Sequence, residues 1–328
     1  MFKKTWKQIK IFAVLIIILI CLPHSILPHR VTTPEKNDLE KYKKQNDNEQ
    51  RLIEFKDNDE ALNLKIDQLA FINNSRKKYN AAPVSLDILA SRVANKMCKE
   101  AADNEYIGHW DLAGEEPYLR YAFAGGYDHV SENAYGEWSS DSYTISPQTI
   151  VSMMKAGHSI FMAERPPNNG HKENIINKAH NFVGIGYFLS GKQFRYYEEF
   201  IDRYLEFDNV PSSLNTDSAS SVTIRTTGSF LYYMVIYREK FPNRLTPAEI
   251  NRRGSYMDFT NEIYKEMPAW DLSRYRNGNI YTIPLSFSKE GLYYIQFYTD
   301  KKEFPKPVSL KTEGKNPESG IVIKVNNQ

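Results

Sequence analysis

The sequence predicts an α+β chain in which a mixed domain of helices and strands precedes a small all-β domain. Residues 86–101 place Leu, Ala, Val and Met at helical spacing on one continuous apolar stripe. Strand-like runs rich in β-branched and aromatic residues occur later, at 222–226, 230–238, 280–287, 292–299 and 321–325. The 22 tyrosines favour a high β content, and 328 residues are enough for about two domains.

Within the first domain, further elements follow from local signals. A helix is expected from residue 61, and Ser146-Pro147 is a good N-cap and first-turn pair for another helix that runs through Phe161. The strand-like runs 183–189 and 194–207 are joined by a Ser-Gly-Lys turn. This pattern predicts a β-hairpin.

Residues 1–28 have the pattern of a targeting segment. Four lysines among the first ten residues precede an unbroken apolar run from Ile11 to Leu22. The run is shorter than the roughly 20 apolar residues of a spanning helix, and residues 23–25 do not form a small-x-small cleavage site. A cleaved signal peptide and an N-terminal membrane anchor both remain open. Either one places the body outside the cytoplasm, secreted or membrane-anchored.

Composition divides the rest of the chain into four segments. Residues 29–60 are polar and charged, and we expect a flexible spacer there. Residues 61–207 form the first folded domain, and residues 208–220 have the Ser, Asn and Asp content of a linker. Residues 221–328 alternate strand-like runs with turn signals, which predicts a small β-sandwich without a motif that carries chemistry.

Charge and cysteine content argue against several classes of protein. The 42 Lys and Arg against 40 Asp and Glu give no electrostatic reason to expect a nucleic-acid partner. Cys21 lies in the N-terminal apolar run, so Cys98 has no disulfide partner in the folded part and is expected to be a buried thiol on the helix stripe. The chain has neither a Gly-x-Ser-x-Gly elbow nor a His-Glu-x-x-His helix, so neither that class of serine hydrolase nor a thermolysin-type protease is supported.

Five separated stretches of the first domain carry distinctive motifs. They are Phe71–Arg76, Gly108-His109-Trp110, Ala124–Tyr127 leading into Ser131-Glu132-Asn133-Ala134, Gly170–Ile176, and Val183–Tyr187. Together and in this order they resemble the CAP superfamily, which is the cysteine-rich secretory, antigen 5 and pathogenesis-related-1 group. The resemblance covers about residues 61–207 and is with the bacterial, cysteine-poor branch, although Lys172 stands where that branch has Arg. It implies an α-β-α sandwich with a central, mostly antiparallel sheet.

The resemblance also implies a cleft in which two His and two acidic residues take up a divalent cation, most often zinc. The matching positions are His109, Glu132 and His171, with Glu164 as the candidate for the second acid. Imidazole and carboxylate groups suit zinc, and their spread along the chain means that the fold must assemble the site. His158, on the inward stripe of the third helix, is a candidate additional cleft residue. A hydrogen-bonded core histidine is the alternative at that position.

The expected function is an extracytoplasmic, non-catalytic binding or signalling module whose partner is a lipid, a glycan or a protein. The alternative is a metal-dependent hydrolase acting on peptide or cell-envelope material, with Glu132 or Glu164 as general base to a metal-bound water. In a third interpretation the first domain is a scaffold and the β domain is adhesive. A metal position open to water favours the enzyme, whereas a site closed by four protein ligands favours binding.

Overall fold

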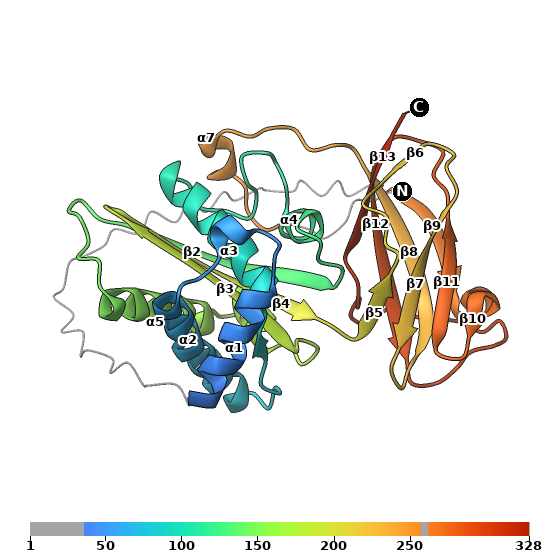
Figure 1. Cartoon of the computed structure of the whole chain (residues 1–328), viewed down its shortest axis with the longest axis horizontal. Helices are drawn as coiled ribbons and strands as arrows, with labels where there is room; N and C mark the ends of the chain where they lie inside the picture. Colours follow the sequence, from blue (N-terminus) through green and yellow to red (C-terminus); the bar gives the residue numbers. More distant parts are fainter. Residues whose placement is uncertain (1–35, 257–261, 328) are drawn as a thin grey trace, which may run out of the picture.

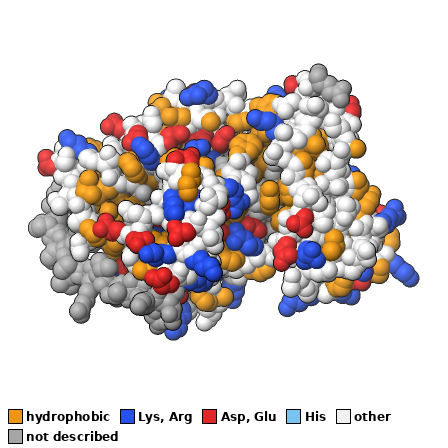
Figure 2. Space-filling model, in the orientation of Figure 1, with side chains coloured by type: hydrophobic (Ala, Val, Ile, Leu, Met, Phe, Trp, Pro, Cys, Tyr) orange, Lys and Arg blue, Asp and Glu red, His pale blue; other side chains and the backbone are white. Residues whose placement is uncertain are grey.

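The computed structural model describes residues 36–256 and 262–327. A sheet flanked by helices lies beside a β-sandwich (Figure 1). The targeting segment expected at residues 1–28 lies outside the described residues. Within the described ranges, no helix has the length and apolar character needed to cross a membrane. Basic and acidic side chains are interspersed over the face shown in Figure 2, in line with the net charge of +2.

The first domain is the predicted α-β-α sandwich. Its sheet has the strand order β1 (Ser85–Leu86), β3 (Phe182–Ser190), β4 (Gln193–Asp202) and β2 (His129–Trp138). Only β1 runs parallel to its neighbour, and β3 and β4 form the predicted hairpin. One face is covered by α2 (Asp59–Lys78), α5 (Pro147–Ala163) and α6 (Gly170–Ile176). The other face is covered by α3 (Ile88–Asp103) and α4 (Pro117–Phe123).

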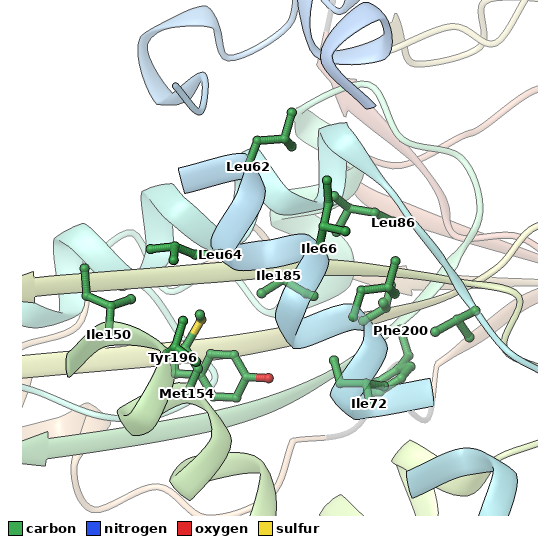
Figure 3. Close-up of a cluster of buried hydrophobic side chains, with 14 of the residues drawn as sticks. Leu62, Leu64, Ile66, Ile72, Leu86, Ile150, Met154, Ile185, Tyr196 and Phe200 are labelled. Carbon is green, nitrogen blue, oxygen red and sulfur yellow. The ribbon is translucent and has the colours of Figure 1, made fainter. Parts of the chain in front are cut away.

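The core on the α2 face is apolar and well filled. Figure 3 shows α2 laid across the sheet, with Ile66 and Ile72 from α2 and Met154 from α5 on the side of Ile185 and Phe200 of the strands. All five side chains are buried. This contact explains why α2 and α5 follow the helical spacing of apolar residues in the sequence.

On the opposite face, α3 lies unusually close to the sheet. A Cβ atom at Gly184 would lie 2.4 Å from the backbone carbonyl carbon of Ala90, and one at Gly186 would lie 2.4 Å from Ala94. The Val-Gly-Ile-Gly alternation in β3 therefore presents its branched side chains to α2 and α5 and its glycines to α3. The helix is capped by Asp87, whose side chain accepts the Ala90 N–H at 2.7 Å, and it begins at Ile88.

The C-terminal domain is the predicted sandwich of two sheets, and all five predicted runs are strands in it. One sheet has the order β10 (Arg276–Asn277), β11 (Ile280–Leu285), β7 (Ser220–Thr226) and β5 (Leu205–Asp208). The other has the order β6 (Ser213–Asn215), β13 (Ile321–Asn326), β12 (Gly291–Asp300), β8 (Phe230–Glu239) and β9 (Ile263–Pro268). Short helical turns are α7 (Pro247–Ile250), α8 (Ala269–Leu272) and η2 (Ser273–Tyr275).

The prediction of a flexible spacer at residues 29–60 is wrong for the described part of that segment. It contains α1 (Lys36–Asn48) and η1 (Ile53–Phe55), and Tyr42 is buried in the first core. The buried Arg92 donates hydrogen bonds to the carbonyls of Asn46 at 2.7 Å and Arg51 at 2.6 Å. Composition cannot reveal that this segment is ordered, because it is held mainly by its backbone carbonyls, which accept hydrogen bonds from the buried guanidinium of Arg92.

The predicted linker at 208–220 is likewise part of the fold, because β6 lies within it and pairs with β13. The run expected as one strand over 194–207 ends at Asp202, and β5 continues it in the other sheet. A shared core joins the domains, with Tyr118 packed against Tyr294 at a ring-centroid distance of 4.6 Å.

Candidate functional site

A cavity of about 580 Å³ opens beside β2, which is the edge strand of the first sheet. All four residues of the predicted tetrad line it, as do residues of the C-terminal domain. The lining consists of His109, Ser131, Glu132, Asn133, Glu164, Pro167, Asn168, Gly170, His171, Asn174, Ser255 and Tyr256. The fold therefore brings together side chains that are spread widely along the sequence.

The first pair in the cavity is His109 with Glu132. His109 lies in the loop between α3 and α4, and its Nδ1 is 2.7 Å from Oε1 of Glu132 on β2. Arg120 of α4 holds both partners, since its Nη1 donates to the His109 carbonyl at 2.6 Å and its Nη2 donates to Oε2 of Glu132. Burial raises the pKa of the Glu132 carboxyl, and the positive charge of Arg120 opposes that rise.

A second buried carboxyl lies behind this pair. Glu199 of β4 is directly opposite Glu132 in the strand register and is completely enclosed. Burial and the neighbouring charge of Glu132 raise the pKa of Glu199 well above its usual value. Among the described residues, no donor reaches either of its oxygens with hydrogen-bond geometry. Burial and the charge of Glu132 thus both favour the protonated form of Glu199, and Arg120 balances the charge of Glu132.

The second pair is His171 with Glu164. Glu164 caps the C-terminal end of α5, and the turn that follows it leads into α6, whose first turn carries His171. Oε1 of Glu164 lies 2.5 Å from His171 Nδ1, and Oε2 accepts the backbone N–H groups of His171 at 3.1 Å and Lys172 at 3.3 Å. The carboxylate thus caps the start of α6 and orients the imidazole at the same time.

The two pairs face one another across the cavity. The rings of His109 and His171 are 6.3 Å apart between centroids, and Phe161 stacks on His171 at 4.7 Å. The four predicted residues therefore converge, but each carboxylate is bonded to the Nδ1 atom of its own histidine. In the part of the chain that the structure describes, no cluster of three or more His, Cys, Asp or Glu has a metal-binding arrangement. The tetrad is two oriented imidazoles with supporting carboxylates, not a preformed set of four ligands.

His158 does not belong to the cleft. It is completely buried between α5 and the sheet, with Nδ1 2.7 Å from Glu198 Oε1 and Nε2 2.9 Å from Ser75 Oγ. The inward stripe of α5 faces the core and not the cavity, so the core alternative is the correct one. Asn133 connects this core network to the cavity, because its Nδ2 donates to Glu198 Oε2 at 3.2 Å and it also lines the cleft.

A chain of side-chain contacts near the cleft has the order of a nucleophile, a base and an acid, and consists of Ser131, His180 and Asp202. Ser131 Oγ is 3.5 Å from His180 Nε2, and His180 Nδ1 is 2.6 Å from Asp202 Oδ1. However, Asn133 uses its amide nitrogen as a donor, so its oxygen accepts from Asn174 Nδ2 at 3.0 Å. Asn174 Oδ1 then accepts from Ser131 Oγ at 2.6 Å. His180 Nε2 is 2.9 Å from Asn174 Oδ1 but 3.5 Å from Ser131 Oγ, so its nearer partner is the amide and the arrangement does not support a serine nucleophile.

Three residues of the site were not predicted from the sequence. Glu199 had a readable signal, because two adjacent carboxylates in the apolar run Tyr196–Phe200 are unusual in a buried strand. Arg120 lies between the quoted stretches Gly108-His109-Trp110 and Ala124–Tyr127, but the sequence does not show that it binds Glu132. Tyr256 belongs to the other domain, and no local pattern connects it with the cleft.

Comparison with known proteins identifies the first domain. Residues 69–200 match the model of the cysteine-rich secretory protein family (CAP), so the first domain is a CAP domain. No curated protein gave a significant match.

Solved structures similar to part of the chain include three bacterial proteins. An extracellular protein containing an SCP domain from Bacillus anthracis is 18% identical, with a TM-score of 0.32, over 42% of this chain and 39% of that one. An outer surface protein of Borrelia burgdorferi is 20% identical, with a TM-score of 0.32, over 41% of this chain and 89% of that one. A cysteine-rich secretory protein of Staphylococcus aureus is 14% identical, with a TM-score of 0.26, over 43% and 38%. The matched region thus spans well under half of the first and third of these proteins.

Proposed function

We propose that the chain is an extracytoplasmic CAP-domain binding protein whose cleft holds a divalent metal, zinc foremost, between His109 and His171. The observation that carries this proposal is the pair of carboxylate-backed imidazoles that face each other at 6.3 Å in one cavity. Carboxylates that orient ligating histidines through the second ring nitrogen are a regular feature of zinc sites. The basic, apolar pattern of residues 1–22 supports a location outside the cytoplasm.

The donor set fits a metal bound by two protein nitrogens. Because Nδ1 of each ring faces its glutamate, the metal would take the Nε2 atoms of His109 and His171. When bound, zinc supplies a Lewis-acidic charge and coordination positions for a ligand oxygen. The protein would hold the imidazoles in the required tautomer and would keep the remaining wall of the cavity polar.

A metal held by two histidines would keep positions open to water, which alone would suit an enzyme, but the contacts of the two carboxylates favour binding over metal-dependent hydrolysis. A general base must reach the attacking water, but Glu132 is shared between His109 and Arg120. Glu164 is shared between His171 and the backbone at the start of α6. Either carboxylate would have to leave its partners to accept a proton. We therefore propose that the cleft recognises its partner without cleaving it.

The cavity wall supports a glycan or peptide partner in preference to a lipid. Ser131, Asn133, Asn168 and Asn174 contribute hydroxyl and amide groups, and Pro167 is the one aliphatic side chain among the lining residues of the described cavity. No Lys or Arg is present among these lining residues. A wall of this kind can hydrogen-bond sugar hydroxyls or peptide amides, while the Tyr256 ring and Pro167 contribute apolar surface for a sugar face or a peptide side chain.

Zinc titration of the full chain by calorimetry tests the proposal. One ion should bind, and zinc at about 100 times its Kd should stabilise the fold by about 2.7 kcal/mol in a thermal-shift assay. His109→Ala and His171→Ala should each abolish both effects. Glu173→Gln should change neither, because Glu173 lies beside His171 but outside the pair. The proposal fails if the wild type binds no zinc, or if both histidine variants bind it as the wild type does.

A further inference from the structure

The C-terminal domain sends a segment back over the first domain. Residues 240–256, which we name the arm, follow β8 and include α7, whose start is closed by a reciprocal capping box between Thr246 and Glu249. The arm docks on residues 107–116, the loop that carries His109. The Leu245 N–H donates to the Leu112 carbonyl at 3.0 Å, and the Ile107 N–H donates to Asn251 Oδ1 at 2.9 Å. Figure 1 shows α7 next to the first domain, away from the sandwich to which it is connected in sequence.

The docking loop is shaped to receive the arm. A Cβ atom at Gly108 would lie 2.8 Å from Cγ2 of Ile250, and one at Gly114 would lie 2.1 Å from the Asn243 carbonyl oxygen. Gly114 also has a φ of +84°, which a residue with a side chain adopts only under strain. Ile250 itself is completely buried in the core formed by α3 and the docking loop. The arm is therefore an integral layer of the first domain's structure.

The arm ends in the cleft at Tyr256. β2 is the edge strand, and the backbone N–H of Glu132 donates to the Tyr256 hydroxyl at 2.8 Å. The Tyr256 ring also packs on His109 with a centroid distance of 4.7 Å. The Tyr256 side chain thus contacts both members of the His109–Glu132 pair: its hydroxyl binds the Glu132 backbone, and its ring packs on the His109 ring. Together with Ser255 it forms a wall of the cavity.

We propose that Tyr256 is a positioning and specificity-determining residue of the cleft, supplied by the C-terminal domain. It fixes the plane of the His109 ring and the position of Glu132, and it narrows the entrance for any glycan or peptide group that reaches the histidines. The effect on ligands rests on the function proposed above, whereas the positioning of His109 does not. The cleft is then a composite site of both domains, and the β domain has a role in it beyond that of an appended module.

Variants of Tyr256 in the full chain separate the role of the ring from that of the hydroxyl. Tyr256→Ala should weaken zinc binding about tenfold, as removal of a group that orients a ligating histidine typically does. Tyr256→Phe keeps the ring over His109 and should bind zinc within about threefold of the wild type, a smaller change than loss of an orienting partner causes. Tyr275→Ala, which removes a partly exposed tyrosine outside the cleft lining, is the matched control and should bind normally. Equal zinc affinity of Tyr256→Ala and the wild type would overturn the positioning role.

NMR of the metal-free chain tests the inference without zinc. The His109 ring resonances should move in Tyr256→Ala, because the ring current of Tyr256 is lost, and should stay near their wild-type positions in Tyr256→Phe. The Glu132 amide should move in both variants, since both lose the hydroxyl acceptor. Unchanged His109 and Glu132 signals in Tyr256→Ala would refute the contact. If the wild type binds no zinc but these shifts occur, the proposed metal function fails while the positioning role of Tyr256 stands.

Discussion

Ile250 anchors the arm, and truncating it to alanine should destabilise the chain substantially. Its side chain is completely buried among Met97, Tyr106, Trp110 and other residues of the core below α3. Core Ile→Ala changes cost about 2–5 kcal/mol. The large rings around Ile250 cannot easily collapse into the space that its outer carbons leave. We therefore expect a loss in the upper part of that range, about 3–4 kcal/mol.

Denaturant unfolding of the full chain measures this loss as a lower midpoint with an unchanged slope. Ile160→Ala is the control, because Ile160 is 53% exposed on α5 and its truncation should change the free energy of unfolding by less than about 0.5 kcal/mol. Limited trypsin digestion gives a second measurement, since Arg252 and Arg253 are exposed and lie two and three residues after Ile250. Cleavage there should accelerate in Ile250→Ala. A loss below 1 kcal/mol with no change in cleavage would show that the arm is not packed as described.

Three further predictions follow from the packing and from buried groups. Gly186→Ala should destabilise by about 1–3 kcal/mol because its Cβ would overlap α3, whereas Gly170→Ala, with no atom within 4 Å of its Cβ, should be tolerated in the same denaturation assay. Cys98 is buried and its burial raises the thiol pKa, so iodoacetamide should label it only in denaturant, as mass spectrometry of its peptide can show. Burial raises the pKa of Glu239, which accepts from Tyr118 across the domain boundary, to about 7. The folded state then binds more protons than the unfolded state between about pH 4.5 and 7, so stability should fall as the pH rises through this window, by at most about 3 kcal/mol. Glu239→Gln should remove this dependence, and an identical pH profile in the variant would contradict the assignment.

Most elements of the fold could be predicted because their signals are local. The stripe of α3, the Ser146-Pro147 start of α5 and the hairpin at 190–192 each depend on neighbouring residues. The segment around α1 could not be predicted in this way, since it is fixed by contacts with Arg92 more than 40 positions away. The linker prediction failed for a similar reason, because short polar strands such as β6 are defined by their partner strand.

The candidate site could be predicted only where a motif marked it. His109, Glu132 and His171 stand in quoted motifs, and Glu164 was placed from its position before His171. The pairing of each carboxylate with Nδ1 depends on tertiary geometry and was not visible in the sequence. His158 is a histidine like His109 and His171, but its side chain on α5 is buried in the core. Residue type alone therefore could not show that it lies outside the cleft.

Tyr256 is the clearest case of a contact without any local signal, because it lies 147 positions after His109 and beyond the predicted domain boundary. Glycines 108 and 114 could have indicated that another chain segment approaches the His109 loop closely. The sequence did not indicate which segment that was.

Anomalous diffraction at the zinc edge, from crystals of the full chain grown with zinc, tests the central claim most directly. The account predicts a single peak in the cleft, bound by the Nε2 atoms of His109 and His171 at about 2.0–2.1 Å, with Glu132 and Glu164 still bonded to the Nδ1 atoms. A cleft without a peak, or a zinc ion bound elsewhere while the two histidines keep only their glutamate partners, would contradict it.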